Sequence, residues 1–213
     1  MSASAVAVPR DAKRRTLLGF FREPEQLAIL RREAARWVMT GVPEVRVWCA
    51  AAATGEVPYS VGMVLAEALQ HTPVEFRILG TDSSKQALAF ARQGRYPVAQ
   101  FAQLPLGLRV RYCEPASGLN GDERVVASLR LRIAFKKLRL LTPPLALRAG
   151  LDLIVCRDQL DELGGFARER VLSEFERLLK PGGLLVLGRS ETLGSVAGFE
   201  SIGCSVYRKA VVA

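Results

Sequence analysis

The chain has 213 residues, 49% of them hydrophobic and 24% charged, a composition typical of one globular domain that buries a core without disulfides or a structural metal. It carries 30 Lys and Arg against 21 Asp and Glu, a formal net charge of +9, and a single histidine, His71. One histidine excludes a His-rich metal site, and it allows a Ser–His or Cys–His catalytic pair only around His71.

The cysteines and the first residues of the chain provide evidence about the cellular compartment. The four cysteines form no CxxC, so we expect no metal or redox site, and reduced, buried thiols are typical of a cytoplasmic protein. Residues 1–16 are basic but have no apolar stretch of signal-peptide length, and no run of about 18 apolar residues follows. We therefore expect 1–16 to be a flexible tail, 17–213 to be one domain, and no membrane insertion.

The predicted elements alternate between helix and strand. In chain order they are a helix at 24–40, a strand at 44–50, a helix at 58–70, a strand at 75–81 and a helix ending near residue 93 that Ser83 or Ser84 caps. After residue 150 they are a strand at 151–156, a helix at 166–179, a break at 181–183, a strand at 184–187 and two edge strands within 199–209. This order predicts an α/β fold, a mostly parallel sheet flanked by helices.

The middle of the chain has a different pattern. Three short strands are expected at 108–113, 124–129 and 131–135, so that about 95–135 forms a small antiparallel β-subdomain inserted in the α/β unit. Residues 92–148 hold 11 basic and 3 acidic residues, a net charge of +8 out of +9. This basic insert is either a solvated face or a docking surface for an acidic partner, and its sparse aromatic residues make nucleic-acid binding the least favoured use.

Two features predict a nucleoside ligand. A run of small residues follows the first strand, where open α/β sheets bind ligands, although a plain tight turn would look the same. Asp82 ends the second strand, a position from which an acidic residue holds a ribose diol, although it could also cap the following helix.

The order of short motifs along the chain is more specific. It includes FFR at 20–22, TGEVPYS at 54–60, GTD at 80–82, CRD at 156–158, LKPGG at 179–183 and GRSE at 188–191. Across about residues 18–209 the sequence resembles the CheR-type chemoreceptor glutamate methyltransferases. The resemblance implies a Rossmann-like S-adenosylmethionine-dependent methyltransferase fold with a small β-subdomain.

The resemblance also implies roles for individual residues. Arg22 would lie over the cofactor and the target carboxylate as the catalytic residue, and Glu56 would bind the cofactor's ammonium group. The remaining cofactor contacts would come from Ala50, Ala51, Ala52, Thr54, Asp82, Arg139, Asp158 and Gln159. A glutamate carboxylate is already nucleophilic, so neither a metal nor a general base is required, and the product would be S-adenosylhomocysteine. The partner would be a chemoreceptor-like or other acidic signalling protein, held by the basic β-subdomain.

The sequence departs from the family pattern at several positions. Val57 replaces a second glutamate, Arg139 and Asp158 stand where the family has asparagine, and Glu162 replaces a tyrosine. Most of the family's N-terminal helical domain is also missing from the sequence. Arg139 would place a positive charge near a sulfonium, and Arg22 could instead form a surface ion pair with Glu23 or Glu25. The alternative function is therefore a degenerate member that serves as a binding or regulatory module.

Overall fold

The computed structural model describes residues 19–117, 121–194 and 198–211. Seven strands form the main sheet in the order β6-β2-β1-β7-β8-β10-β9, and three form a small sheet in the order β3-β5-β4. The strands are β1 Glu44–Ala50, β2 Glu75–Asp82, β3 Arg95–Tyr96, β4 Cys113–Pro115, β5 Glu123–Val125, β6 Ile133–Lys137, β7 Leu151–Cys156, β8 Leu179–Leu187, β9 Phe199–Gly203 and β10 Val206–Lys209. The α-helices are α1 Pro24–Met39, α2 Glu56–Leu69, α3 Lys85–Gln93, α4 Leu106–Tyr112, α5 Ala127–Arg130 and α6 Gly165–Leu178, and two short 3₁₀ helices are η2 Val98–Phe101 and η3 Leu160–Glu162.

The strand order creates a switch point beside β1. From β1 the chain steps outward to β2 and then to β6, all parallel, and then returns to β7 on the other side of β1. The loops that leave β1 and β7 therefore diverge at the carboxyl end of the sheet, which is where open α/β sheets bind their ligands. Strands β7 and β8 are parallel, and β10 and β9 complete the sheet in antiparallel pairing.

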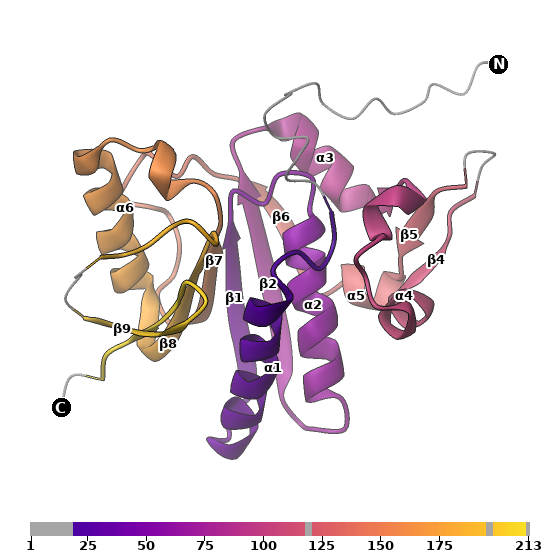
Figure 1. Cartoon of the computed structure of the whole chain (residues 1–213), viewed down its shortest axis with the longest axis horizontal. Coiled ribbons are helices and arrows are strands. Elements are labelled where there is room, and N and C mark those ends of the chain that lie inside the picture. The colour runs from indigo at the N-terminus through magenta and orange to yellow at the C-terminus, as the bar shows by residue number, and fades with distance from the viewer. Residues whose placement is uncertain (1–18, 118–120, 195–197, 212–213) are drawn as a thin grey trace.

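Helices cover both faces of the main sheet (Figure 1). One hydrophobic cluster joins alternate residues of the strands, such as Val47 and Val155, to α1 and α2. The other joins the opposite side chains, such as Trp48 and Ile154, to α6. Because β7 is buried along its whole length, its sequence is a continuous apolar run interrupted only by Asp152. The α/β architecture predicted from the element order, with helices on both sides of a mostly parallel sheet, is confirmed.

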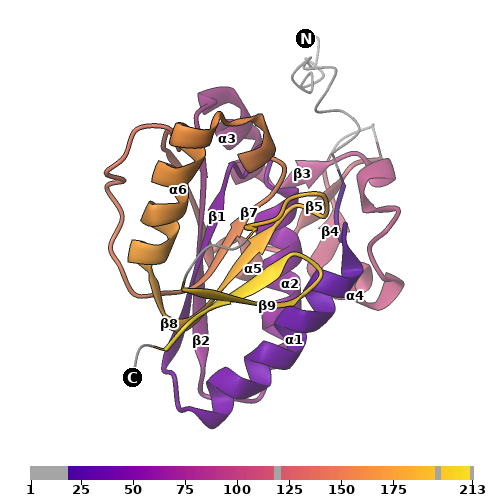
Figure 2. The same cartoon turned by 60° about the vertical axis from the view of Figure 1, so that its left-hand side comes forward.

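The small sheet lies beside α2 and α3 and is part of the same core (Figure 2). Tyr96 of β3 is fully buried, and its ring contacts Phe20, Tyr59, Phe90 and Phe101. An inserted antiparallel sheet was predicted and is present, but its components differ from those expected.

Of the three strands predicted for the insert, the first is wrong, the second (124–129) ends early because β5 stops at Val125 and α5 follows, and the third is a strand of the other sheet. The first, at 108–113, is mostly helix α4, which begins after Pro105 and buries none of its side chains. Its alternation of basic and apolar residues resembles that of a strand, but the partly buried residues that pack against the core are Leu108 and Tyr112, which lie one helical turn apart, whereas Val110 between them is exposed. The third predicted strand is β6, but it pairs with β2 in the main sheet, so the antiparallel sheet ends at β5.

Other differences are smaller. The break predicted at 181–183 is an irregular stretch within β8, whose register with β7 shifts between Leu151 and Leu153. Ser84, not Ser83, caps α3 by accepting a hydrogen bond from the Ala87 amide at 3.1 Å. All four cysteines are free, but only Cys49 and Cys156 are buried, and Cys204 is exposed in the β9–β10 turn.

Two predictions concern the ends of the chain and the membrane. The flexible tail predicted at 1–16 lies outside the described residues. Among the residues that are described, the helices are all too short or too polar to cross a bilayer.

Candidate functional site

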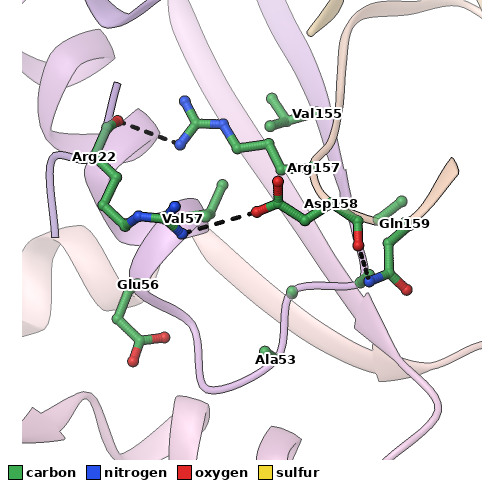
Figure 3. A pocket seen from close by; sticks show the side chains of 11 residues that line it. Arg22, Ala53, Glu56, Val57, Val155, Arg157, Asp158 and Gln159 are labelled. Atoms are coloured by element: carbon green, nitrogen blue, oxygen red, sulfur yellow. Dashed lines mark hydrogen bonds and ion pairs between the residues drawn. The ribbon is translucent and has the colours of Figure 1, made fainter. Parts of the chain in front are cut away.

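A pocket opens at the switch point, between the loops that follow β1 and β7. Its position is the one that the topology predicts for a ligand. It is lined by Arg22, Ala50, Ala51, Ala52, Ala53, Glu56, Val57, Val155, Arg157, Asp158 and Gln159. We call this the inner pocket (Figure 3).

The loop after β1 forms the floor of the inner pocket. Ala51 and Ala53 have positive φ angles of 53° and 47°, a conformation that residues with a Cβ rarely adopt. The loop is held because the Ala52 amide donates to the Thr81 carbonyl at 2.8 Å and the Ala53 amide donates to Asp82 Oδ2 at 3.0 Å. Small side chains on a fixed, strained turn bring the backbone itself close to a ligand.

Glu56 places a buried carboxylate on the wall of the pocket. It is the first residue of α2, is 4% exposed, and both its oxygens accept from the Thr54 hydroxyl at 2.7 and 2.8 Å. Burial raises the pKa of Glu56, and the Thr54 hydrogen bond only partly offsets this effect. No cationic group of the described residues pairs with it, so a positively charged ligand group would supply the missing partner.

Asp82 holds the loop from behind. It is 3% exposed, and besides the Ala53 amide it accepts from the Ser84 amide through Oδ1 at 2.8 Å. Each carboxylate oxygen therefore already has one backbone donor and retains a second lone pair. Asp82 does not line the inner pocket, and its visible role is to join the β1 loop to the start of α3.

The FFR segment at 20–22 crosses the pocket just before α1. The Phe21 amide donates to Ser60 Oγ at 3.0 Å, and Ser60 in turn donates to the Glu56 carbonyl at 2.7 Å. The Ser of the PYS motif thus fixes the FFR motif to the first turn of α2. Arg22 reaches across the pocket and forms an ion pair with Asp158, with Nη1 and Oδ2 3.8 Å apart.

Arg157 lies under this segment and is almost fully buried. Its Nε is 3.2 Å from Glu23 Oε2, and its Nη1 donates to the Arg22 carbonyl at 3.3 Å (Figure 3). Burial lowers the pKa of Arg157, and Glu23 opposes this shift. Phe21 and Glu23 both have a φ of 57°, so the ion pair holds a strained turn in place.

Glu191 fixes the loop after β7. It is 2% exposed and accepts from four backbone amides at 2.6–2.9 Å, those of Asp158, Gln159, Leu160 and Gly188. A carboxylate that collects several amides is a strong anchor, because each bond is charge-assisted. It explains how Asp158 can keep a φ of 57° at the pocket wall.

The structure brings together most of the predicted site residues. Seven of them line the inner pocket: Arg22, Ala50, Ala51, Ala52, Glu56, Asp158 and Gln159. The other three do not: Thr54 and Asp82 are buried behind the lining, and Arg139 is exposed just beyond β6. Arg139 follows Leu138, whose amide donates to the Asp82 carbonyl at 3.1 Å, so it lies on the Asp82 side of the site.

Sequence reasoning missed Arg157 and Glu191. Both belong to motifs that were recognised, but in CRD only Asp158 was given a role, and in GRSE no residue was given one. A charged residue at the end of an otherwise apolar strand could have indicated Arg157, because a charged group that is buried there requires partners of opposite charge or hydrogen-bonding partners. Among the described residues, no group of three or more His, Cys, Asp or Glu is arranged to hold a metal ion.

Comparison with known proteins agrees with this geometry. Residues 17–208 match the family described as CheR methyltransferase, SAM binding domain. Chemotaxis protein methyltransferase 2 of Pseudomonas aeruginosa is 35% identical over 196 residues, which are 91% of this chain and 70% of that protein. The chemotaxis protein methyltransferase of Borreliella burgdorferi is 31% identical over 89% of this chain and 69% of that protein. That of Escherichia coli is 35% identical over 90% of this chain and 66% of that protein. The chain belongs to the CheR family of S-adenosylmethionine-dependent methyltransferases.

Proposed function

We propose that this protein transfers a methyl group from S-adenosylmethionine to glutamate side chains of chemoreceptor-like signalling proteins. The observation that carries the proposal is the inner pocket. It joins a buried carboxylate without a cationic partner, Glu56, to an arginine at its mouth, Arg22. The first suits a cofactor that bears an ammonium group, and the second suits an acceptor that bears a carboxylate.

The residues of the inner pocket fit the cofactor. Glu56 would bind its ammonium group, and Ala50, Ala51 and Ala52 would contact its methionine portion through the exposed loop backbone. Asp158 and Gln159 would complete the opposite wall. Pairing the Glu56 carboxylate would remove the cost of burying it alone, so cofactor binding would gain from a site that is unfavourable when empty.

Three further residues would act at the nucleoside end. Asp82 would accept from the ribose hydroxyls through its second lone pairs, and Thr54 would keep the Glu56 carboxylate in place. Arg139 lies beyond the lining on the Asp82 side and is exposed, so water screens its repulsion of a sulfonium. The charge conflict that favoured a degenerate, non-catalytic module is therefore weakened.

The lining is suited to methyl transfer without proton transfer. Taken over the described residues, it contains no His, Lys, Cys or Tyr. A bound S-adenosylmethionine would supply an electrophilic methyl group. An acceptor carboxylate oxygen would form the new C–O bond while the C–S bond breaks and its electron pair stays on sulfur, so that no proton would need to move. The chain's own contribution is then orientation, which Arg22 would provide by holding the acceptor carboxylate.

The basic insert would contribute to acceptor docking. Residues 92–148 carry nearly the whole net charge. Arg111 is exposed and Arg132 is half-buried, although they are paired with Glu67 and Glu75. This face would attract an acidic signalling protein, and dissolved salt would shorten the range of that attraction.

Raising ionic strength from 50 to 500 mM should therefore increase the acceptor KM about tenfold, whereas the S-adenosylhomocysteine Kd changes less than threefold. An acceptor KM that does not change with ionic strength would exclude electrostatic docking.

The enzymatic proposal is tested by incubation with methyl-labelled S-adenosylmethionine and the cytoplasmic fragment of a chemoreceptor. Carboxyl methyl esters release labelled methanol in base, whereas N- and S-methyl groups do not. We expect wild-type protein to form such esters and Arg22→Ala to form them about 100-fold more slowly. Arg32→Ala, which removes an exposed arginine of α1 outside the basic insert and the inner pocket, should match the wild type. Wild-type transfer by Arg22→Ala would contradict its role.

A further inference from the structure

A second hollow adjoins the inner pocket on its solvent side. It has a volume of about 680 Å³ and is lined by residues from the start of α1, from the turn after η2 and from the turns after β7 and β8, among them Glu25, Gln103, Arg189 and Ser190. We call it the outer hollow. Arg22 and Asp158 line both spaces, and each of these two side chains is 27% exposed. The Arg22–Asp158 ion pair therefore stands at the junction between the two spaces.

Arg189 presents a cation to the outer hollow from a fixed turn. The Glu191 amide donates to the Gly188 carbonyl at 2.9 Å, and the Gly188 amide donates to the Glu191 carboxylate at 2.7 Å. The same carboxylate anchors the loop that carries Asp158. The backbone of Arg189 is thus rigidly related to the junction, while its side chain is exposed and forms no ion pair or hydrogen bond with the described residues.

The other charged residues of the outer hollow leave it with a positive side and a negative side. Glu23 is balanced by Arg157 at 3.2 Å, and Asp158 by Arg22. Glu25 is exposed in the first turn of α1 and has no cationic partner in the described part of the chain. An anionic group entering the hollow is therefore attracted toward Arg189 and repelled by Glu25, which favours one orientation of an acidic chain.

We propose that the outer hollow binds the acceptor segment, an acidic peptide stretch, and that Arg189 determines specificity by binding a carboxylate of that stretch. This inference rests on the proposed function. The acceptor carboxylate that reacts lies at Arg22, and a neighbouring carboxylate of the same stretch lies at Arg189. Methylation turns the reacting carboxylate into a neutral ester, so the product loses its attraction to Arg22 and leaves more readily than the substrate.

The test measures initial rates of base-labile methyl transfer against the concentration of a chemoreceptor cytoplasmic fragment. We expect Arg189→Glu to raise the KM for the fragment at least tenfold and Arg189→Ala to raise it about threefold, with kcat within twofold of wild type. Arg189→Lys should retain most of the wild-type affinity. Arg32→Glu makes the same charge change at an exposed site of α1 that lies outside the basic insert and lines neither the inner pocket nor the outer hollow, and it should leave KM unchanged.

Calorimetry with S-adenosylhomocysteine separates the possible failures. The inference predicts equal S-adenosylhomocysteine Kd values for wild type and Arg189→Glu, because Arg189 does not line the inner pocket. An unchanged KM in Arg189→Glu, or a weakened S-adenosylhomocysteine Kd, overturns the acceptor site and leaves the proposed function standing. The absence of any base-labile ester with wild-type protein overturns both.

Discussion

At the scale of single residues, the site is organised by buried charges. Glu56, Arg157 and Glu191 are each almost fully buried, but their surroundings differ. Arg157 has Glu23, and Glu191 has backbone amides, so both have their partners within the protein. Among the described residues, Glu56 has the Thr54 hydroxyl and a backbone amide as hydrogen-bond donors, but no cation. This contrast separates two structural anchors from a residue whose partner comes from outside.

The unbalanced burial of Glu56 has a consequence for stability. A carboxyl whose pKa is raised by folding adds stability below its unfolded pKa of about 4.3, and that stability is lost as pH rises through the folded value. Ligand-free Glu56→Gln should therefore have a Tm about 2–4 °C above the wild type at pH 7.5, and the difference should vanish near pH 4. Thermal denaturation across pH measures this.

Glu200→Gln provides the matched control, because Glu200 is exposed on β9. Its Tm should follow the wild type at every pH. If Glu56→Gln is instead less stable than wild type at pH 7.5, the carboxylate already has a stabilising partner, and the ligand-binding role would lose its physical basis.

At the scale of elements, the pocket depends on close packing of the insert against the β1 loop. The Tyr96 hydroxyl donates to the Thr54 carbonyl at 2.7 Å, and the Tyr59 hydroxyl donates to the Ala91 carbonyl at 2.8 Å. Gly55, which precedes α2, sits between these groups with a φ of 102°. The insert is therefore a support for the inner pocket as well as a candidate docking surface.

Gly55→Ala tests this support. An added Cβ would lie 2.8 Å from the Tyr96 hydroxyl and 2.9 Å from Ala91 Cβ, at a backbone angle that suits glycine. We expect a loss of roughly 2–3 kcal/mol in the free energy of unfolding and a clear fall in S-adenosylhomocysteine affinity. Denaturant unfolding and calorimetry report the two effects.

Gly107→Ala is the matched control within α4, where a Cβ meets nothing within 4 Å. It should stabilise the protein by about 0.5–1 kcal/mol and leave ligand affinity unchanged. Equal behaviour of the two variants would show that Gly55 is an ordinary loop residue.

Helix α4 also shows where sequence reasoning stops at this scale. Leu106 and Val110 are 74% and 75% exposed, so the strand-like alternation does not mark the buried face, which Leu108 and Tyr112 form at helical spacing. Strands β1 and β7, which are covered on both faces, were predicted with their observed limits because their apolar runs do report burial. The accuracy of the prediction follows how completely each element is buried.

At the scale of the whole molecule, the order of elements predicts the switch point and the inner pocket. The motifs predict most of its lining, since FFR, TGE and CRD meet there as expected. The positions of Asp82 and Arg139 relative to that pocket depend on how β2 and β6 pair at the sheet edge. The local sequence does not determine that pairing, because the sequence of β6 is equally compatible with a strand of the inserted sheet.

The central claim is that the inner pocket binds the cofactor through Glu56, and a calorimetric titration with S-adenosylhomocysteine tests it most directly. We expect wild-type protein to bind one equivalent with a micromolar Kd, and Glu56→Gln to bind at least tenfold more weakly, because the ammonium group loses its counter-charge. The absence of binding heat at millimolar ligand, or equal affinity of the two proteins, would contradict the claim.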